Sequence, residues 1–373
     1  MTESHSPAPE SPTEPRRATL GAKLLLSLGS VLLFLGGIEG ALRLAGFARP
    51  PKFYFDDQIG LRFFPDRQVT MLFGEQTSGT ASLNEWGMRG PAFAAEPSPG
   101  TCRIVCLGDS FTMGWGVSDD ETYPVALQRW LDQNVPDLPC EVLNVGTVDH
   151  NTVNELRVYR HLVRDWKPDV VILGYVPNDV QPETLGATSA GTRFEHRLQS
   201  TAIYSYLKRK LRGSDQFDVG WNAENQRRRK EFTENFRTIT CDPEDPISRS
   251  YWEVSMNALE SLVQETRADG VEFLLVRFPG AGQVRSLETA EQEKRAGRRP
   301  RKLAGGLLAQ AKLRTEAKRL GVRLINLLPE FRSLGVEGAF GPTDTSHPSP
   351  EAFTVAAERI GSTLVSLGLL RDG

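Results

Sequence analysis

The chain has a serine, a histidine and an aspartate that come after apolar runs. Together these three residue types can activate a hydroxyl for acyl transfer. Ser110 comes just after the run 102–107, and a serine hydroxyl is a weak nucleophile until a base takes its proton. His347 is the candidate base, because Asp344 precedes it by three residues. At that spacing a carboxylate can reach the imidazole Nδ1 and fix its tautomer. These residues predict a serine nucleophile with a histidine base and an orienting aspartate.

The other four histidines are weaker candidates for the base. His150 follows the apolar run 141–145 and is the one rival for the role. The remaining three lie in a polar tail, a helical pattern and a polar stretch, and these are His5, His161 and His196. The sequence therefore favours His347.

Acyl transfer also needs hydrogen-bond donors for the oxyanion that develops on the substrate carbonyl. We expect three donors. They are the backbone N–H of Ser110, the backbone N–H of Gly146, where a missing side chain lets substrate approach, and the side-chain amide of Asn178, which follows another apolar run. A turn-forming role is the alternative for Asn178. Asp109 and Asp179 are expected to support these groups, with Asp109 bracing the turn rather than reacting.

The elements that must position these residues alternate along the chain. Short, apolar and β-branched runs predict strands buried on both faces at 102–107, 141–145, 169–176, 271–278 and 322–328. Helical patterns lie at 122–134, 151–166, 251–268, 305–320 and 350–366. This alternation predicts an α/β fold, a five-stranded parallel sheet in a three-layer α/β/α arrangement. Because ligands bind at the carboxyl ends of such strands, the candidate residues are expected along one edge of the sheet.

Two polar stretches interrupt the alternation and are interpreted as insertions, at about 183–250 and 284–304. The first holds the basic clusters KRKLR (208–212) and RRRK (227–230), and the second holds EKRAGRRPRK. An electropositive surface for an acidic glycan or an anionic lipid is one interpretation. A solvated helix or loop face is the favoured one.

The N-terminal part of the chain divides by composition. Residues 1–23 form a polar tail that we expect to be disordered. Residues 24–44 are apolar and come close to the roughly 20 residues that a bilayer requires. Residues 45–100 are rich in proline, glycine and aromatic residues, and predict a linker and a lead-in that packs on the main domain. That domain, 101–373, is expected to carry the chemistry.

The apolar segment predicts a transmembrane signal anchor. It has no charge between residues 24 and 38, and the charged Glu39 and Arg43 that follow are four apart, so they can pair on a helix. A cleaved signal would need a small-residue cleavage site, and GGIEGALRLAG offers no good one. An uncleaved anchor is therefore favoured over a cleaved signal and over a buried helix. The short tail favours a cytoplasmic N-terminus, with the catalytic domain periplasmic or extracellular.

Composition excludes some functions. The 373 residues carry a net charge of −3, which argues against nucleic acid as the main partner. The four cysteines show no CxxC spacing, so no zinc site is indicated. A disulfide between Cys102 and Cys140 stays open, although buried free thiols are favoured. The oligomeric state is not determined by the sequence.

Four motifs in their order along the chain closely resemble the SGNH (GDSL) hydrolase superfamily. They are GDSF, the glycine of NVG, PND and DTSH, and the resemblance covers about residues 84–366. NEWGMRGP is similar to the lead-in of bacterial, membrane-anchored members. The resemblance implies a flavodoxin-like fold and ester hydrolysis, or less often acyl transfer to or from sugars, without a metal or cofactor. It assigns catalysis to Ser110, Asp344 and His347, and the oxyanion hole to Ser110, Gly146 and Asn178.

Two departures from the family pattern concern the substrate. The loop GTVDHNT has Asp149 and His150 where members often carry a second glycine, and HPSPEAF stands where HPNxxGH is common. Neither removes a catalytic group. We expect a serine esterase acting on O-acyl or O-acetyl groups of a carbohydrate or small molecule. The alternatives are an O-acyltransferase for a cell-envelope polysaccharide and a catalytically silent, membrane-tethered glycan-binding module.

Overall fold

A computed structural model describes most of the chain, namely residues 19–46, 52–56, 58–73, 76–181, 201–212, 223–285, 304–341 and 346–370. Residues 1–18 of the predicted disordered tail and the cluster EKRAGRRPRK lie outside these residues. The last four residues of that tail, from Leu20 to Lys23, are instead the first residues of a helix, because Thr19 caps it by accepting the Ala22 N–H. The chain forms two compact units. The first comprises Met1–Pro50 with Glu195–Gln216, and the second comprises Pro51–Phe194 with Phe217–Gly373.

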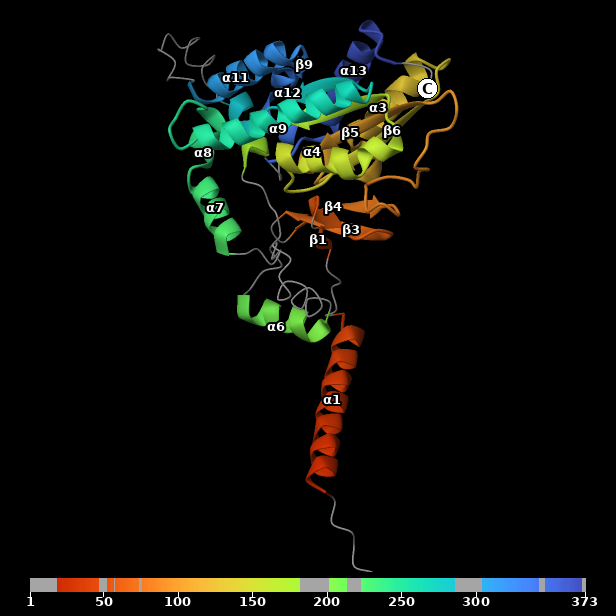
Figure 1. The fold of residues 1–373 in the computed structure, drawn as a ribbon, viewed down its shortest axis with the longest axis vertical. Helices are drawn as coiled ribbons and strands as arrows, with labels where there is room; N and C mark the ends of the chain where they lie inside the picture. Colours follow the sequence, from red (N-terminus) through yellow and green to blue (C-terminus); the bar gives the residue numbers. More distant parts are fainter. Residues whose placement is uncertain are drawn as a thin grey trace, which may run out of the picture. The chain divides into compact units, whose positions relative to one another are not determined.

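The described residues of the first unit form two helices, α1 (Leu20–Leu44) and α6 (Ala202–Arg212) (Figure 1). α1 has 25 residues with a mean hydropathy of 1.8 and is not buried by the rest of the protein. It is long and apolar enough to cross a membrane, which fits an anchor or a signal sequence equally. Arg43 Nε donates to Glu39 Oε1 at 2.8 Å, as their spacing predicted.

The second unit is built on a five-stranded parallel sheet. Its strands are β5 (Cys102–Gly108), β6 (Cys140–Gly146), β7 (Val170–Tyr175), β8 (Glu272–Arg277) and β9 (Arg323–Asn326). The order across the sheet is β6-β5-β7-β8-β9, which is the flavodoxin-like order. Gly108, Gly146 and Gly174 lie side by side in the register, so the first three strands end level with one another. The predicted fold class is confirmed.

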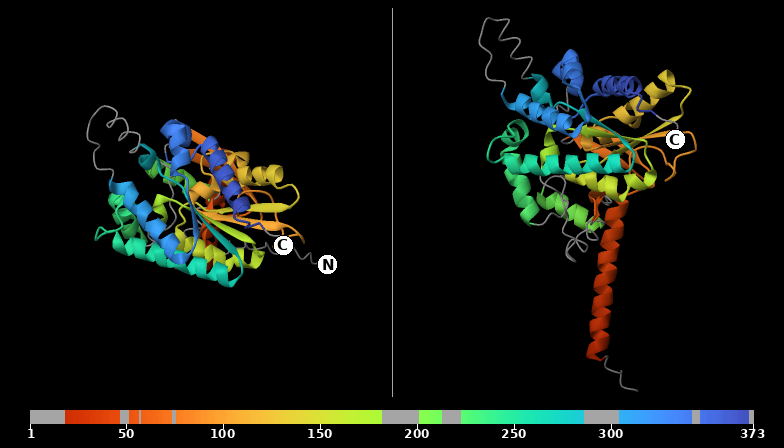
Figure 2. Two further views of the ribbon diagram at one scale, coloured as in Figure 1. Left: turned by 90° about the horizontal axis from the view of Figure 1, so that it is seen from above. Right: turned by 45° about the horizontal axis from the view of Figure 1, so that its top comes forward.

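Helices cover both faces of the sheet and complete three layers (Figure 2). Both faces are covered because successive side chains of β5 point to opposite faces and those from Ile104 to Leu107 are all apolar. Ile104 and Cys106 belong to one apolar core, and Val105 and Leu107 belong to the other. The first core is closed by α3 (Tyr123–Asn134), α12 (Leu328–Phe340) and α13 (Pro350–Ser366). The second is closed by α4 (Thr152–His161), α9 (Arg249–Ala268) and α11 (Ala304–Leu320).

The structure differs from the predicted helices in two places. The helix expected over 151–166 ends at His161, and a 3-10 turn η2 (Val163–Trp166) follows. α12 was not predicted, because Gly335 interrupts it with a left-handed φ of 70° and masks the helical pattern. The first insertion also holds two helices of the second unit, α7 (Ala223–Glu234) and α8 (Phe236–Cys241).

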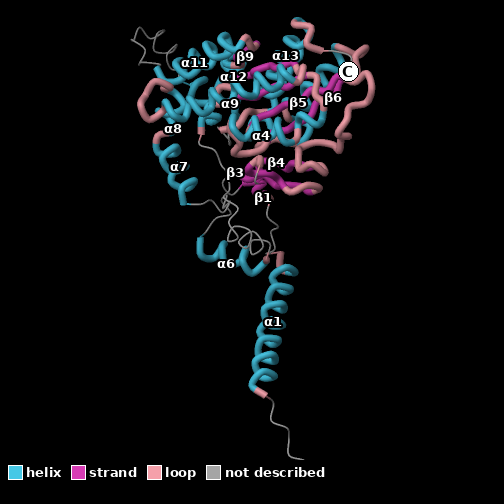
Figure 3. Tube along the Cα trace, viewed as in Figure 1, coloured by secondary structure: helices cyan, strands magenta, loops and turns pink. Residues whose placement is uncertain are grey.

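The lead-in forms two antiparallel hairpins (Figure 3). They are β1 (Phe53–Asp56) with β2 (Gly60–Phe63), and β3 (Arg67–Phe73) with β4 (Gln76–Leu83). Together they form a third apolar cluster, which includes Met113 and Trp115 after β5 and Val148 after β6. The hairpins therefore pack on the loops at the carboxyl edge of the sheet, and Trp115 belongs to this packing.

The cysteines are free thiols, as the sequence favoured. Cys102 and Cys140 are direct neighbours across β5 and β6 without being bonded. Burial raises the pKa of Cys106 to about 12, so this thiol stays protonated and acts as a small apolar side chain.

Candidate active site

Ser110 is the first residue of a short helix, α2 (Ser110–Met113), directly after β5. The strand can turn sharply because Gly108 has no side chain, since a Cβ there would lie 2.1 Å from Thr112 Oγ1. Asp109 caps the helix, and its Oδ1 accepts the Phe111 N–H at 2.8 Å. The turn therefore presents the serine at the carboxyl edge of the sheet.

His347 reaches Ser110 from the segment between α12 and α13. Its Nε2 lies 3.0 Å from Ser110 Oγ, and its ring packs 5.6 Å from that of Phe111. Two residues later, Ser349 caps α13 by accepting the Ala352 N–H at 3.2 Å, which fixes the end of the segment. In this geometry an unprotonated Nε2 can take the hydroxyl proton of the serine.

The remaining histidines do not contact Ser110 in the described part of the chain. His150 is buried and its Nε2 lies 2.7 Å from the Leu61 carbonyl oxygen. Burial lowers its pKa to about 4, so the ring is neutral and held in place. His161 is exposed on α4. Asp344, His5 and His196 lie outside the described residues, so the predicted contact between Asp344 and His347 is not described.

A hydrogen bond links Asn178 to Asp109, the residue that precedes the serine. Asn178 belongs to the 3-10 turn η3 (Pro177–Val180) that follows β7. Its Nδ2 donates to Asp109 Oδ2 at 3.0 Å, and the same oxygen lies 3.5 Å from Ser110 Oγ. Asp109 is fully buried. It therefore braces the turn and orients the amide of Asn178 at once.

Gly146 lies beside this group, but its surroundings differ from the expectation. A Cβ at this position would lie 2.1 Å from the backbone nitrogen of Met113, so the close approach is made by α2 rather than by substrate. Its N–H donates to Asn144 Oδ1 at 3.1 Å. The predicted donor at Gly146 thus has a partner within the protein.

Three fully buried carboxyl groups lie behind the serine, on Asp109, Glu155 and Asp179. Asp179 Oδ2 accepts the Val176 N–H at 2.8 Å, whereas neither Glu155 oxygen has a hydrogen-bond partner among the described residues. Burial, and repulsion among these groups, raise the pKa of Glu155 and of Asp179 well above the usual values. Burial also raises the pKa of Asp109, against its hydrogen bonds. We expect Glu155 to be neutral. The described residues contain no cluster of three His, Cys, Asp or Glu side chains that could hold a metal ion.

Arg89 supports the serine loop and was not identified from the sequence as a site residue. Its Nη1 donates to the carbonyl of Met113 at 3.0 Å and its Nη2 to that of Val117 at 2.7 Å. Its Nε donates to Asp119 Oδ1 at 2.8 Å. The signal for it was the motif NEWGMRGP, which contains this arginine.

The first insertion also reaches the carboxyl edge. Asp149, in the loop after β6, has a φ of 64° in the left-handed region that favours glycine. Its carboxylate pairs with Arg229 of α7, and its carbonyl accepts the Gln181 Nε2 at 3.0 Å. Gln181 directly follows η3, so this loop is tied both to the Asn178 turn and to the insertion.

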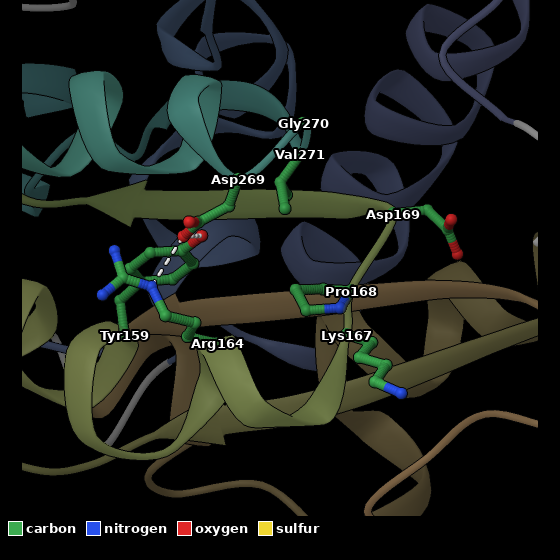
Figure 4. A pocket seen from close by; sticks show the side chains of 8 residues that line it. All are labelled: Tyr159, Arg164, Lys167, Pro168, Asp169, Asp269, Gly270 and Val271. Carbon is green, nitrogen blue, oxygen red and sulfur yellow. Dashed lines mark hydrogen bonds and ion pairs between the residues drawn. The ribbon is translucent and has the colours of Figure 1, made fainter.

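A cavity of about 410 Å³ lies at the opposite, amino edge of the sheet (Figure 4). It is lined by residues that precede β7 and β8, among them Pro168 and Gly270. Two of its charged groups pair with each other, with Arg164 Nε donating to Asp269 Oδ2 at 2.7 Å. This cavity is therefore separate from the serine and its histidine.

The fold and the site define a three-layer α/β/α protein with a serine–histidine pair at the carboxyl edge of its sheet. No protein-family model and no curated protein matches the chain. Solved structures with similarity include TesA, which is 15% identical with a TM-score of 0.39 over 71% of this chain and 99% of its own.

Two further similar structures carry lipase and esterase names. A GDSL-like lipase from Bacteroides thetaiotaomicron is 13% identical with a TM-score of 0.33, over 71% of this chain and 88% of its own. The esterase EstA from Pseudoalteromonas is 13% identical with a TM-score of 0.38, over 71% of this chain and 97% of its own.

Proposed function

We propose that this protein is a serine ester hydrolase with Ser110 as its nucleophile. The observation that carries the proposal is the 3.0 Å distance between Ser110 Oγ and His347 Nε2 at the carboxyl edge of the sheet. The four ordered motifs support it independently. We assign Asp344 to orient His347, as its spacing in the sequence suggests.

In the proposed reaction, Ser110 Oγ attacks the ester carbonyl carbon while its proton passes to His347 Nε2. The oxyanion is stabilised by the Ser110 N–H and the Asn178 amide, each such donor contributing about 2.7–4 kcal/mol. The Gly146 N–H was also expected as a donor, but in the structure it donates to Asn144 Oδ1. The C–O bond then breaks, and His347 returns the proton to the leaving alcohol. Water, deprotonated by His347, hydrolyses the acyl-enzyme and regenerates the serine.

The substrate class is proposed as an O-acyl or O-acetyl ester of a carbohydrate or small molecule. The transferase alternative uses the same residues, with a sugar hydroxyl of an envelope polysaccharide in place of water. Incubation with an acyl donor and a glycan separates them. Free acid with no acylated glycan identifies a hydrolase, and acylated glycan identifies a transferase.

We further propose that α1 is an uncleaved membrane anchor with the catalytic unit outside the cytoplasm. The support is its apolar length and the Glu39–Arg43 pair near its end. The intact N-terminus should be recovered from membranes by mass spectrometry, and a mature protein that begins after residue 44 would contradict the proposal.

Fluorophosphonate labelling of the full chain tests the nucleophile. We expect Ser110 to be labelled, Ser110→Ala to abolish labelling and His347→Ala to reduce it by at least about 10³-fold, since the base activates the serine. Ser346→Ala, next to the histidine, is the matched control and should retain labelling. A well-folded chain that does not react would favour the silent glycan-binding module instead.

A further inference from the structure

The basic cluster at 208–212 belongs to a helix that is attached to α1. The backbone N–H groups of Ala202 and Ile203, the first two residues of α6, donate to the Glu39 carboxylate at 2.8 and 3.0 Å. The first N–H groups of a helix have no partner within it. Glu39 therefore fixes the start of α6 to α1, across more than 160 residues of sequence.

The attachment lies near the carboxyl-terminal end of α1. Glu39 is five residues before Leu44, which is about 7 Å along the helix axis. Glu39 also accepts from Arg43 Nε at 2.8 Å, so one carboxylate holds both a guanidinium group and the start of α6. If α1 spans a bilayer, these charged groups lie in its interfacial region, where the headgroups are.

α6 runs crosswise to α1 at this end (Figure 1). A helix crosswise to a membrane-spanning helix lies parallel to the membrane plane. Leu207 is about half exposed, at 49%, and Tyr204 and Tyr206 precede it. Tyrosine is enriched at membrane–water interfaces. Both the direction and the composition of α6 suit the surface of a bilayer.

The charge of α6 distinguishes it from the other basic helix. Its sequence AIYSYLKRKLR contains four basic residues and no acidic one. α7 has a comparable cluster, but Arg227 and Lys230 pair with Glu231 and Glu234 on the same helix. The sequence of α7 thus supplies acidic partners on the same helix, whereas the sequence of α6 contains none.

We propose that α6 is a membrane-surface helix whose basic residues bind the phosphates of anionic lipid headgroups. The proposal rests on the proposed membrane-spanning role of α1. Such binding holds α6 at the bilayer surface, and it follows the general rule that juxtamembrane basic clusters recognise anionic lipids.

Hydrogen exchange of the full chain in lipid nanodiscs tests the proposal. One set of nanodiscs contains phosphatidylcholine alone, and the other contains phosphatidylcholine with phosphatidylglycerol. We expect peptides covering 201–212 to exchange at least about tenfold more slowly with the anionic lipid. High salt should reduce the difference, because it screens surface charge.

Two matched variants separate lipid binding from fold. The triple change Lys208→Gln, Arg209→Gln and Lys210→Gln should abolish the difference between the two lipids. Changing Arg227, Arg228 and Lys230 of α7 to glutamine should preserve it, and this set spares Arg229. Equal exchange of 201–212 in both lipids, or equal loss in both variants, overturns the proposal.

The α1 peptides show which proposal fails. If the α1 amides are protected from exchange but the exchange of α6 does not depend on lipid composition, the anchor proposal stands. In that case only the lipid-binding role of α6 is overturned. α1 amides that exchange as fast in nanodiscs as in a solvent-exposed helix overturn the anchor, and the membrane-surface role of α6 with it.

Discussion

The hydroxyl of Ser110 has two acceptors within reach, and the distances rank them. His347 Nε2 is 3.0 Å away and Asp109 Oδ2 is 3.5 Å away, so the histidine is the better acceptor. Asp109 is instead occupied by the Phe111 N–H and the Asn178 amide. These contacts support the proposal that His347 reacts with the serine while Asp109 braces the turn.

Replacing Asn178 by alanine should impair the chemical step. Loss of one oxyanion donor lowers kcat by a factor of about 10²–10³, whereas KM should change little because the donor acts mainly in the transition state. Steady-state kinetics with a soluble ester measure both constants. Asn134→Ala removes an exposed asparagine amide on α3 and is the control. A kcat for Asn178→Ala within twofold of the parent would exclude the assigned role.

Glu155→Gln should make the stability of the protein less dependent on pH. The folded-state pKa of Glu155 is raised by burial, so the folded chain keeps a proton that the unfolded chain releases above its ordinary pKa. Its contribution to stability is therefore complete below the unfolded pKa. It is lost as pH rises toward the folded value, by up to about 1.4 kcal/mol per pH unit.

Thermal unfolding at about pH 5 and about pH 8 measures this effect. Glutamine is neutral at both, so the Tm of the variant relative to the parent should rise with pH. Glu253→Gln changes an exposed glutamate on α9 and should show no such trend. A Glu155→Gln variant whose relative Tm falls with pH would mean that Glu155 is ionised in the fold.

At the scale of elements, the loop after α2 depends on the lead-in rather than on the sheet alone. Arg89 follows the second hairpin and binds the carbonyl groups of Met113, Gly114 and Val117. These acceptors are buried or half-buried, and each one left unsatisfied costs about 1–3 kcal/mol. The lead-in therefore takes part in forming the site through Arg89, in addition to the apolar packing of its hairpins on Met113 and Trp115.

Arg89→Met should lower the free energy of unfolding by about 3 kcal/mol or more, because it removes these donors together. Urea unfolding followed by fluorescence measures the change. Arg160→Met breaks an exposed ion pair with Glu265 and should cost less than about 1 kcal/mol. Similar losses in the two variants would show that the Arg89 contacts do not stabilise the loop.

At the scale of the whole second unit, the first insertion is connected to the candidate site through Asp149 and Arg229. Phe232, one turn further along α7, is buried and packs against Phe236 and Tyr251. The insertion is thus held by an apolar contact and an ion pair at the carboxyl edge. We expect the pair to hold the loop after β6 for substrate binding.

A double-mutant cycle with Asp149→Asn and Arg229→Gln tests this. Contacting charges should show a coupling energy of about 0.5–3 kcal/mol in kcat/KM, mostly through KM, since neither residue touches the serine. Lys230→Gln, the neighbouring exposed residue on α7, is the control. If the effects of the two changes on kcat/KM are additive, the ion pair between the insertion and the loop after β6 does not contribute to substrate binding.

Much of the fold follows from local pattern. The five apolar runs are strands in the structure, each within a few residues of its predicted bounds, because burial on both faces leaves continuous apolar sequence. The hairpins of the lead-in escaped prediction, since their proline, glycine and aromatic content shows no clear period. α12 escaped because Gly335 breaks its helical pattern.

The sequence by itself determined the parallel sheet and which residues follow its strands. Chain direction alone brings Ser110 and Asn178 to one edge, because parallel strands end together. Only the tertiary structure decided the partners of each group. In the structure α2 packs against Gly146, and the Gly146 N–H donates to Asn144. Glu155 is buried, and Arg89 donates to the loop that follows the serine. Most of these contacts join residues distant in sequence, the Gly146–Asn144 bond excepted. Packing selects among partners that composition and spacing leave equivalent.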